Sequence, residues 1–216
     1  MRKLQNIDAI LFDMMGVLLF KNSNYIPNTI VDEIDTLVGR VTDDYIFKQE
    51  TLKKFRLNEE DFNNILSQIV EKYEPFQQLW GLLPELRKHY KLAIINNGTT
   101  LTLPQFDQKL KFDKFFDLFV SSAKEGVRKP DGEIFLTTAS RLKVDPRRCL
   151  FMDDSEVNIE GAKRIGMQTI LWPNKNDGYK KLIEFIGTKN LHHLTRVIRK
   201  IKKIFSNPDK INQDFV

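Results

Sequence analysis

The chain has 216 residues, of which 41% are hydrophobic and 29% are charged, and its formal net charge is +5. This length suits one sizeable domain, or one domain with a smaller insertion, and the composition excludes wholesale disorder. No run approaches the roughly 18 apolar residues of a membrane span, and the amino terminus lacks a signal-type apolar region. The single cysteine, Cys149, excludes an internal disulfide, and its place in an apolar run predicts a buried, unreactive thiol. We therefore expect a cytoplasmic protein.

A short apolar run near the amino terminus predicts the first strand. Residues 9–12 read Ala-Ile-Leu-Phe, which is typical of a strand buried on both faces of a parallel sheet. Asp13 ends this run, and Gly16 then lets the backbone turn away. In open α/β sheets the carboxyl ends of the strands form the crevice that binds ligands, so Asp13 is a candidate site residue. Taken alone, the same residue could equally serve a turn or a helix cap.

Residues 21–80 predict a helical insertion, without strand-like alternation, between the first strand and the next. Asn58 is typical of a helix start, and an apolar stripe follows it at helical spacing. We expect this insertion to form a cap over the carboxyl ends of the strands. Another of its predicted helices, residues 42–55, would have an apolar face formed by Tyr45, Ile46, Leu52 and Phe55.

From residue 91 onward, apolar runs and helical patterns alternate with short connections. This alternation predicts an α/β fold with a doubly wound parallel sheet. Residues 1–20 and 81–190 would form the core domain, and residues 21–80 the helical cap. Residues 191–216 form a basic tail with apolar positions at helical spacing, and we favour a docked helix over contact with nucleic acid or a membrane surface. The expected strands cover residues 92–95, 118–120, 149–152 and 168–171, and the expected helices residues 131–142, 155–165 and 180–186.

Two polar segments carry chemistry that Asp13 would need. Asn96, Asn97 and Gly98 follow the second predicted core strand, where side-chain amides and a glycine offer donors to an anion. Lys129 precedes a proline and a helix, and there it could neutralise two negative groups in the crevice. Taken alone, the asparagines could instead bond their own loop, and Lys129 could be an ordinary surface residue.

Two adjacent carboxylates, Asp153 and Asp154, give the strongest single signal. They end an apolar strand and open a helix, where a lone Asp would be a helix cap. Two such carboxylates repel each other unless a cation neutralises them. Together with Asp13 they would supply the oxygen ligands that Mg²⁺ prefers, and waters and a substrate phosphate would complete the octahedron. We therefore favour metal binding over capping.

The order of these motifs resembles the haloacid dehalogenase superfamily. The run from Phe151-Met152-Asp153-Asp154 through Asn158 to Gly166 is most similar to its phosphatases with a small helical cap, such as the amino-terminal phosphatase domain of soluble epoxide hydrolase. The resemblance covers residues 7–187. It implies a Rossmann-like core and a small phosphorylated metabolite as the substrate.

The resemblance also implies a role for each motif residue. Asp13 would attack phosphorus and form an aspartyl-phosphate, which water then hydrolyses. Mg²⁺ would be held by Asp13, Asp154 and the backbone carbonyl of Met15, and Asp153 would orient metal-bound water from behind these ligands. Lys129 would bridge the nucleophile and the phosphate. The remaining roles would be phosphate binding by Asn96, Asn97 and Gly98, and support of the Asp153–Asp154 loop by Asn158.

One position departs from the family pattern. Phosphatases of this family carry an Asp two residues after the nucleophile, where it protonates the leaving group and activates water, whereas this chain has Met15. A thioether carries no proton near neutral pH, so a contribution of about 10²–10⁴-fold should be missing. We therefore expect a phosphatase of reduced activity that is slowest on alkyl phosphates. A milder departure is Asn96, which replaces the usual Ser or Thr.

Two other functions stay open at this point. A non-catalytic family member could bind a phosphorylated ligand or partner through the same metal-binding residues and act as a regulatory protein. A 2-haloacid dehalogenase also lacks the second Asp, but it needs no metal and would leave Asp153 and Asp154 without a role. We do not expect nucleic acid as a partner, and the sequence does not predict an oligomeric state.

Overall fold

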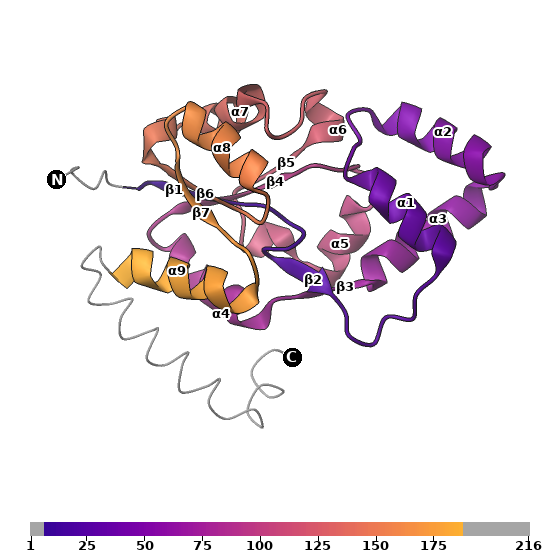
Figure 1. The fold of residues 1–216 in the computed structure, drawn as a ribbon, viewed down its shortest axis with the longest axis horizontal. Helices are drawn as coiled ribbons and strands as arrows, with labels where there is room; N and C mark the ends of the chain where they lie inside the picture. The colour runs from indigo at the N-terminus through magenta and orange to yellow at the C-terminus, as the bar shows by residue number, and fades with distance from the viewer. Residues whose placement is uncertain (1–6, 188–216) are drawn as a thin grey trace.

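The computed structural model describes residues 7–187, and the predicted tail helix within residues 191–216 lies outside these residues. At its centre is a sheet of five parallel strands in the order β5-β4-β1-β6-β7 (Figure 1). This sheet confirms the predicted α/β fold. Because β1 is in the middle, its carboxyl end has a neighbouring strand on each side. The strands are β1 (Ala9–Phe12), β4 (Lys91–Asn96), β5 (Leu118–Ser121), β6 (Cys149–Asp153) and β7 (Gln168–Leu171).

Helices cover both faces of this sheet. They are α4 (Gln77–Arg87), α5 (Leu103–Leu110), α6 (Ser122–Glu125), α7 (Gly132–Leu142), α8 (Glu156–Arg164) and α9 (Lys175–Gly187), with short 3-10 turns at Phe112–Lys114 and Pro146–Arg148. Figure 1 shows α7 and α8 on one face and α4 and α9 on the other. Among residues 7–187, no helix has both the length and the apolar character that a membrane crossing needs.

The apolar run of β1 is explained by these two helical layers. Successive side chains of a strand point to opposite faces. Ile10 and Phe12 accordingly pack in the core on the side of α4 and α9, and Ala9 and Leu11 pack on the side of α7 and α8. The second core also holds Cys149, where burial raises the pKa of the thiol to about 12. The predicted burial of the cysteine is therefore confirmed, and the raised pKa agrees with an unreactive thiol.

Three helices form the cap beside the sheet (Figure 1). Each begins at a residue whose side chain accepts a hydrogen bond from a backbone N–H of the first turn, and these residues are Asn28, Asp43 and the predicted Asn58. The cap has a hydrophobic core of its own, against which Leu101 and Ala123 of the main body pack. The cap helices are α1 (Thr29–Val38), α2 (Asp44–Phe55) and α3 (Glu59–Glu71).

The last part of the predicted helical insertion contains a short strand. Strand β3 (Tyr73–Pro75) pairs antiparallel with β2 (Leu19–Lys21), so the expectation of an insertion without strands is wrong in this segment. Pro75 lacks a backbone N–H and therefore suits an edge strand better than a helix interior. Helix α4 then packs Leu79 and Trp80 into the same hydrophobic core as the sheet.

The apolar face predicted for residues 42–55 is also wrong in part. Tyr45 and Ile46 are 74% and 53% exposed, whereas Phe47 is buried and its ring lies 6.1 Å from that of Phe62. The first turn of α2 is fixed by Asp44, whose carboxylate accepts hydrogen bonds from the loop after β4. This tertiary contact, rather than the hydrophobic pattern, determines which face of α2 is buried.

Candidate active site

A cavity of about 240 Å³ lies between the cap and the carboxyl ends of the central strands. Asp13 and Asn96, which end β1 and β4, line its sheet side together with Lys129. Asp35 of α1 and Tyr73 of β3 line its cap side. Ligands of α/β proteins bind at this edge of the sheet, so the cavity is the candidate active site.

Lys129 lies at the centre of the charged groups of this site. Its side chain is 1% exposed, and its Nζ is 2.5 Å from Oδ1 of Asp13 and 2.8 Å from Oδ2 of Asp153. Nζ also donates to the backbone carbonyl of Ile95 at 2.8 Å. An ammonium group has three donors, so all of them are used. The structure thus brings together Asp13 and Lys129, two of the predicted site residues.

Three carboxylates converge beside this lysine. Oxygen atoms of Asp13, Asp153 and Asp154 lie within 4.8 Å of one another. Burial raises the pKa of Asp13 to about 7; Lys129 lowers it, whereas the charges of Asp153 and Asp154 add to the increase. One ammonium group does not balance three carboxylates at this spacing, so the donor set suits a divalent cation with oxygen ligands.

Gly16 allows one of these carboxylates to approach. Its φ is +87°, a conformation that L side chains rarely adopt, and an added Cβ would lie 2.4 Å from Oδ2 of Asp154. The turn between β1 and β2 therefore needs glycine for its backbone and for its contact with the acidic loop. This explains physically the Gly16 that follows Asp13 in the sequence.

Asp153 is fully buried and held from three sides. Besides Lys129, it accepts hydrogen bonds from the backbone N–H of Ser155 at 2.8 Å and from Nδ2 of Asn158 at 3.0 and 3.1 Å. Both of its oxygens are thus occupied by protein donors. This geometry agrees with a position behind the metal ligands and with the supporting role predicted for Asn158.

Asn97 and Gly98 have other partners than the predicted phosphate. Nδ2 of Asn97 donates to the carbonyl of Lys129 at 3.0 Å, and the N–H of Lys129 donates to its Oδ1 at 2.9 Å. The N–H of Gly98 donates to Oγ of Ser122 at 2.9 Å. In this structure the Asn97 side chain thus positions the backbone of Lys129, and the N–H of Gly98 anchors its own loop. The phosphate-binding role expected for these two residues stays a prediction.

Asn96 lines the cavity. Its side chain makes no hydrogen bond within the part of the chain that the structure describes, although the residue is only 8% exposed. A Cβ at Gly98 would lie 2.8 Å from Nδ2 of Asn96, so Gly98 leaves room for this amide. An unpaired buried amide that faces a cavity is a donor for an anion.

The position of Lys129 depends on close packing between its loop and α8. A Cβ added at Gly161 would lie 2.4 Å from the carbonyl oxygen of Pro130. We expect Gly161→Ala to push this loop away and lower the free energy of unfolding by about 1–3 kcal/mol, as overpacking does. Chemical denaturation measures the change. Gly39→Ala is the stability control, because nothing lies within 4 Å of its added Cβ; equal losses in the two variants would contradict the packing argument.

The sequence did not predict three cap residues at or beside the cavity. Asp35, Lys72 and Tyr73 form a hydrogen-bonded cluster, and Asp35 and Tyr73 line the cavity. A single Asp or Tyr within an insertion has no spacing signature, so no sequence pattern distinguishes these residues from ordinary surface positions.

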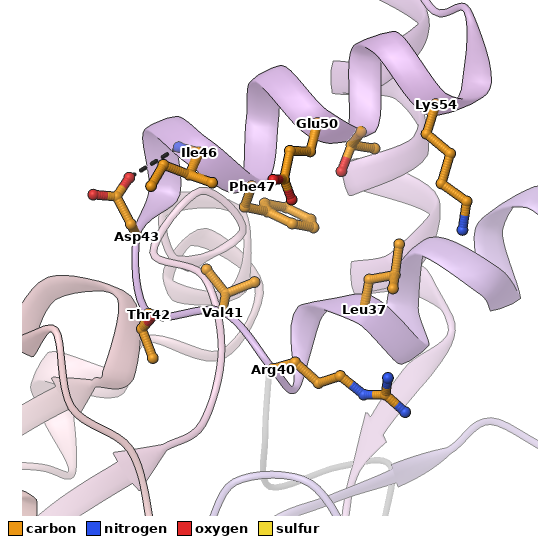
Figure 2. A pocket seen from close by; sticks show the side chains of 10 residues that line it. Leu37, Arg40, Val41, Thr42, Asp43, Ile46, Phe47, Glu50 and Lys54 are labelled. Carbon is orange, nitrogen blue, oxygen red and sulfur yellow. Dashed lines mark hydrogen bonds between the residues drawn. The ribbon is translucent and has the colours of Figure 1, made fainter.

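A second cavity, of about 380 Å³, lies within the cap between α1 and α2 (Figure 2). Leu37, Val41 and Phe47 form its apolar side, and Glu50 and Lys54 lie along its rim. This cavity is larger than the one that Asp13 lines, but none of the motif residues lines it. We therefore do not take it as the candidate active site.

Comparisons with known proteins agree with this arrangement. The family model described as "Haloacid dehalogenase-like hydrolase" matches residues 10–172. N-acylneuraminate-9-phosphatase of Rattus norvegicus is 30% identical over 99 residues, which are 45% of this chain and 40% of the relative. The chain thus spans less than half the length of that relative. Phosphoglycolate phosphatase of Aquifex aeolicus is 28% identical over 197 residues, which are 81% of this chain and 87% of the relative.

A solved structure shows the same fold. A haloacid dehalogenase family enzyme from Bacteroides thetaiotaomicron, in complex with magnesium and inorganic phosphate, superposes with a TM-score of 0.60 and 19% identity. The alignment covers 76% of this chain and 93% of that one. The family match spans the whole parallel sheet and the loops that carry Asp13, Lys129 and the Asp153–Asp154 pair. The chain therefore belongs to the haloacid dehalogenase-like hydrolase family.

Proposed function

We propose that this protein is a magnesium-dependent phosphatase that acts on a small phosphorylated metabolite through an aspartyl-phosphate on Asp13. The observation that carries the proposal is the buried contact between Asp13 and Lys129 beside two further carboxylates, at one wall of a cavity. Two relatives that the comparisons name, an N-acylneuraminate-9-phosphatase and a phosphoglycolate phosphatase, support phosphate esters as the substrate class.

Asp13 would act as the nucleophile. Lys129 bonds its Oδ1, and Oδ2 has no hydrogen-bond partner among residues 7–187, so Oδ2 is the oxygen we expect to attack phosphorus. The new bond joins Oδ2 to phosphorus, and the ester oxygen leaves with the electron pair of the broken bond. Water then cleaves the aspartyl-phosphate, which releases phosphate and restores the carboxylate. Lys129 stabilises negative charge in both steps.

The acidic residues would hold the metal. Asp13, Asp154 and the backbone carbonyl of Met15 would be the protein ligands of Mg²⁺. When bound, the ion would neutralise and orient the phosphoryl group. Asp153 would keep Lys129 and the loop of Asp154 in place, because Ser155 and Asn158 already occupy its oxygens. Asn96 would donate to an oxygen of the transferring group.

Met15 supports a second candidate function, the binding of a phosphorylated ligand without turnover. The residue lines the cavity, where an acid would protonate the leaving group. One experiment separates the candidates: release of inorganic phosphate from a panel of phosphate esters, with Mg²⁺ and with EDTA. Metal-dependent release supports the phosphatase, ligand binding without release supports the second candidate, and release of halide from 2-haloacids would support a dehalogenase instead.

Restoring an acid at position 15 should increase the activity. We expect Met15→Asp to raise the rate of phosphate release from alkyl esters by about 10²-fold, because the leaving alkoxide would receive a proton. Activated aryl esters should gain less. Met15→Asn is the matched control, since it has the size of Asp without its acidity. A gain of the same size in both variants would show that polarity rather than proton transfer limits the rate.

A further inference from the structure

Asp35 lines the cap side of the cavity, and one of its carboxylate oxygens has no hydrogen-bond partner among residues 7–187. Nζ of Lys72 donates to its Oδ2 at 2.6 Å, and the hydroxyl of Tyr73 donates to the same atom at 2.7 Å. No donor within residues 7–187 bonds Oδ1. The side chain is 12% exposed, and the residue lines the cavity that holds Asp13. The bound oxygen fixes the carboxylate, and the free oxygen is left for a ligand.

Asp35 and Asp32 share one lysine beside the cavity. Lys72 is shared between Asp35 and Asp32, whose Oδ1 lies 2.7 Å from Nζ. The charge of Lys21 also lowers the pKa of Asp32, so Asp32 has a second cation nearby. Asp32 does not line the cavity, so Asp35 is the carboxylate of this pair that a ligand in the cavity would meet. A hydrogen-bond donor satisfies such an oxygen, and an apolar group would leave it desolvated and unpaired.

The cavity is polar at its sheet side and at its cap side, with apolar side chains in its wall. Lys129, Asn96 and Asp13 lie on the sheet side, where the proposed function places the phosphate. A small ligand held there would extend its other end towards the cap. The apolar side chains that line the cavity include Met15, Val38, Ile69, Leu103, Phe106 and Phe119.

We propose that Asp35 is a specificity residue whose Oδ1 accepts a hydrogen bond from a hydroxyl or ammonium group on the leaving-group end of the substrate. The inference rests on the proposed function for the position of the phosphate. It narrows the substrate class to phosphate esters that carry a donor at the end remote from phosphorus. Sites built to bond a polar group reject analogues that lack it far more strongly than apolar pockets reject a change of size.

Binding of alkylphosphonates tests this inference without turnover, because their carbon–phosphorus bond is not an ester. Calorimetry on the full chain in Mg²⁺ would compare 3-aminopropylphosphonate and 3-hydroxypropylphosphonate with n-butylphosphonate, which has the same length, and then homologues of other chain lengths. At the best-fitting length we expect the donor ligands to bind about tenfold tighter or more. Equal affinities at every length would overturn the proposal.

A matched pair of variants locates the effect. In Asp35→Asn, Lys72 and Tyr73 should fix the amide oxygen at the position of Oδ2, so an NH₂ group would replace the free Oδ1. The preference for donor ligands should then disappear. Asp32→Asn removes a charge from the same lysine without touching the cavity, and it should keep the preference. Equal loss in both variants would assign the effect to general charge and overturn the role of Asp35.

The outcomes also separate this inference from the proposed function. Absence of binding for every phosphonate, including the donor ligands, would mean that the phosphate site itself is wrong. Binding without preference would leave the phosphate site intact and remove only Asp35. Thermal melting would identify an unfolded variant, and the comparison of ligands on the unmodified protein decides the question even then.

Discussion

Replacing Lys129 with Met should lower the free energy of unfolding by about 3–5 kcal/mol in the absence of metal, the usual effect of removing one partner from a buried ion pair. Lys129 and Asp153 are almost wholly buried, and Asp13 is nearly so. Without the ammonium group, Asp13 and Asp153 would face each other with no cation between them. Phosphate release should also fall by about 10²-fold or more, since a charged donor to the transferring group is lost. Chemical denaturation and a phosphate assay measure the two effects.

The stability deficit of this variant should depend on metal and on pH. Mg²⁺ should raise its melting temperature more than that of the unmodified protein, because a cation replaces part of the lost charge. Burial already raises the pKa of Asp13, and loss of Lys129 removes the contribution that lowers it. When the pKa of a carboxyl group is higher in the folded than in the unfolded state, the free energy of unfolding decreases as the pH rises through the folded-state pKa. The deficit should therefore shrink when the pH falls from about 8 to about 5.

Lys72→Met is the matched control for this prediction. Lys72 is also a buried lysine between two carboxylates, Asp32 and Asp35, but it does not contact the proposed metal ligands. The Lys72→Met variant should be less stable than the unmodified protein, and Mg²⁺ should not restore its stability. If Mg²⁺ restored both variants equally, the ion would be acting as a general counterion, and the site at Asp13 would lose this support.

Much of the sheet side of the candidate site could be predicted from the sequence, because Asp13 and the Asp153–Asp154 pair lie at the carboxyl ends of strands and Lys129 lies in the loop before α7. Asp13 and Lys129 are 116 positions apart, yet their side chains are in contact. Parallel strands bring their carboxyl ends to the same edge of the sheet, so a motif placed after each strand converges with the others without further information. Each of these residues taken alone also fits a cap, a turn or a surface position, so it is the order of the motifs that predicts the convergence of Asp13, Lys129, Asp153 and Asp154.

Other residues could not be placed because their partners are chosen by tertiary packing. Nothing in the Asn96-Asn97-Gly98 segment indicates that the Asn97 side chain bonds the backbone of Lys129, whereas that of Asn96 has no partner among the described residues. The same holds for the cap, where Tyr45 and Ile46 follow a helical pattern but are exposed. Asp35 has no sequence signature, and only the fold places it in the lining of the cavity. The substrate-facing side of the site is thus the part that sequence patterns describe least.

The Asp13→Asn variant should be inactive and at least as stable as the unmodified protein. A neutral amide does not attack phosphorus, and loss of a nucleophile in other hydrolases lowers turnover by up to about 10⁶-fold. We expect phosphate release to fall by at least about 10⁴-fold. Stability should not fall, because burial disfavours the Asp13 carboxylate, and its removal leaves Lys129 paired with Asp153. Phosphate assays and thermal melting without metal measure the two quantities.

Asp8→Asn provides the control for this variant at the opposite end of the same strand. Asp8 precedes β1 and forms an exposed ion pair with Arg148, far from the cavity lining. Its loss should change stability by less than about 1 kcal/mol and leave turnover unaltered. If Asp13→Asn released phosphate as fast as Asp8→Asn, Asp13 would not be the nucleophile. A marked drop in melting temperature of Asp13→Asn would instead show that its pair with Lys129 stabilises the fold, contrary to the desolvation argument.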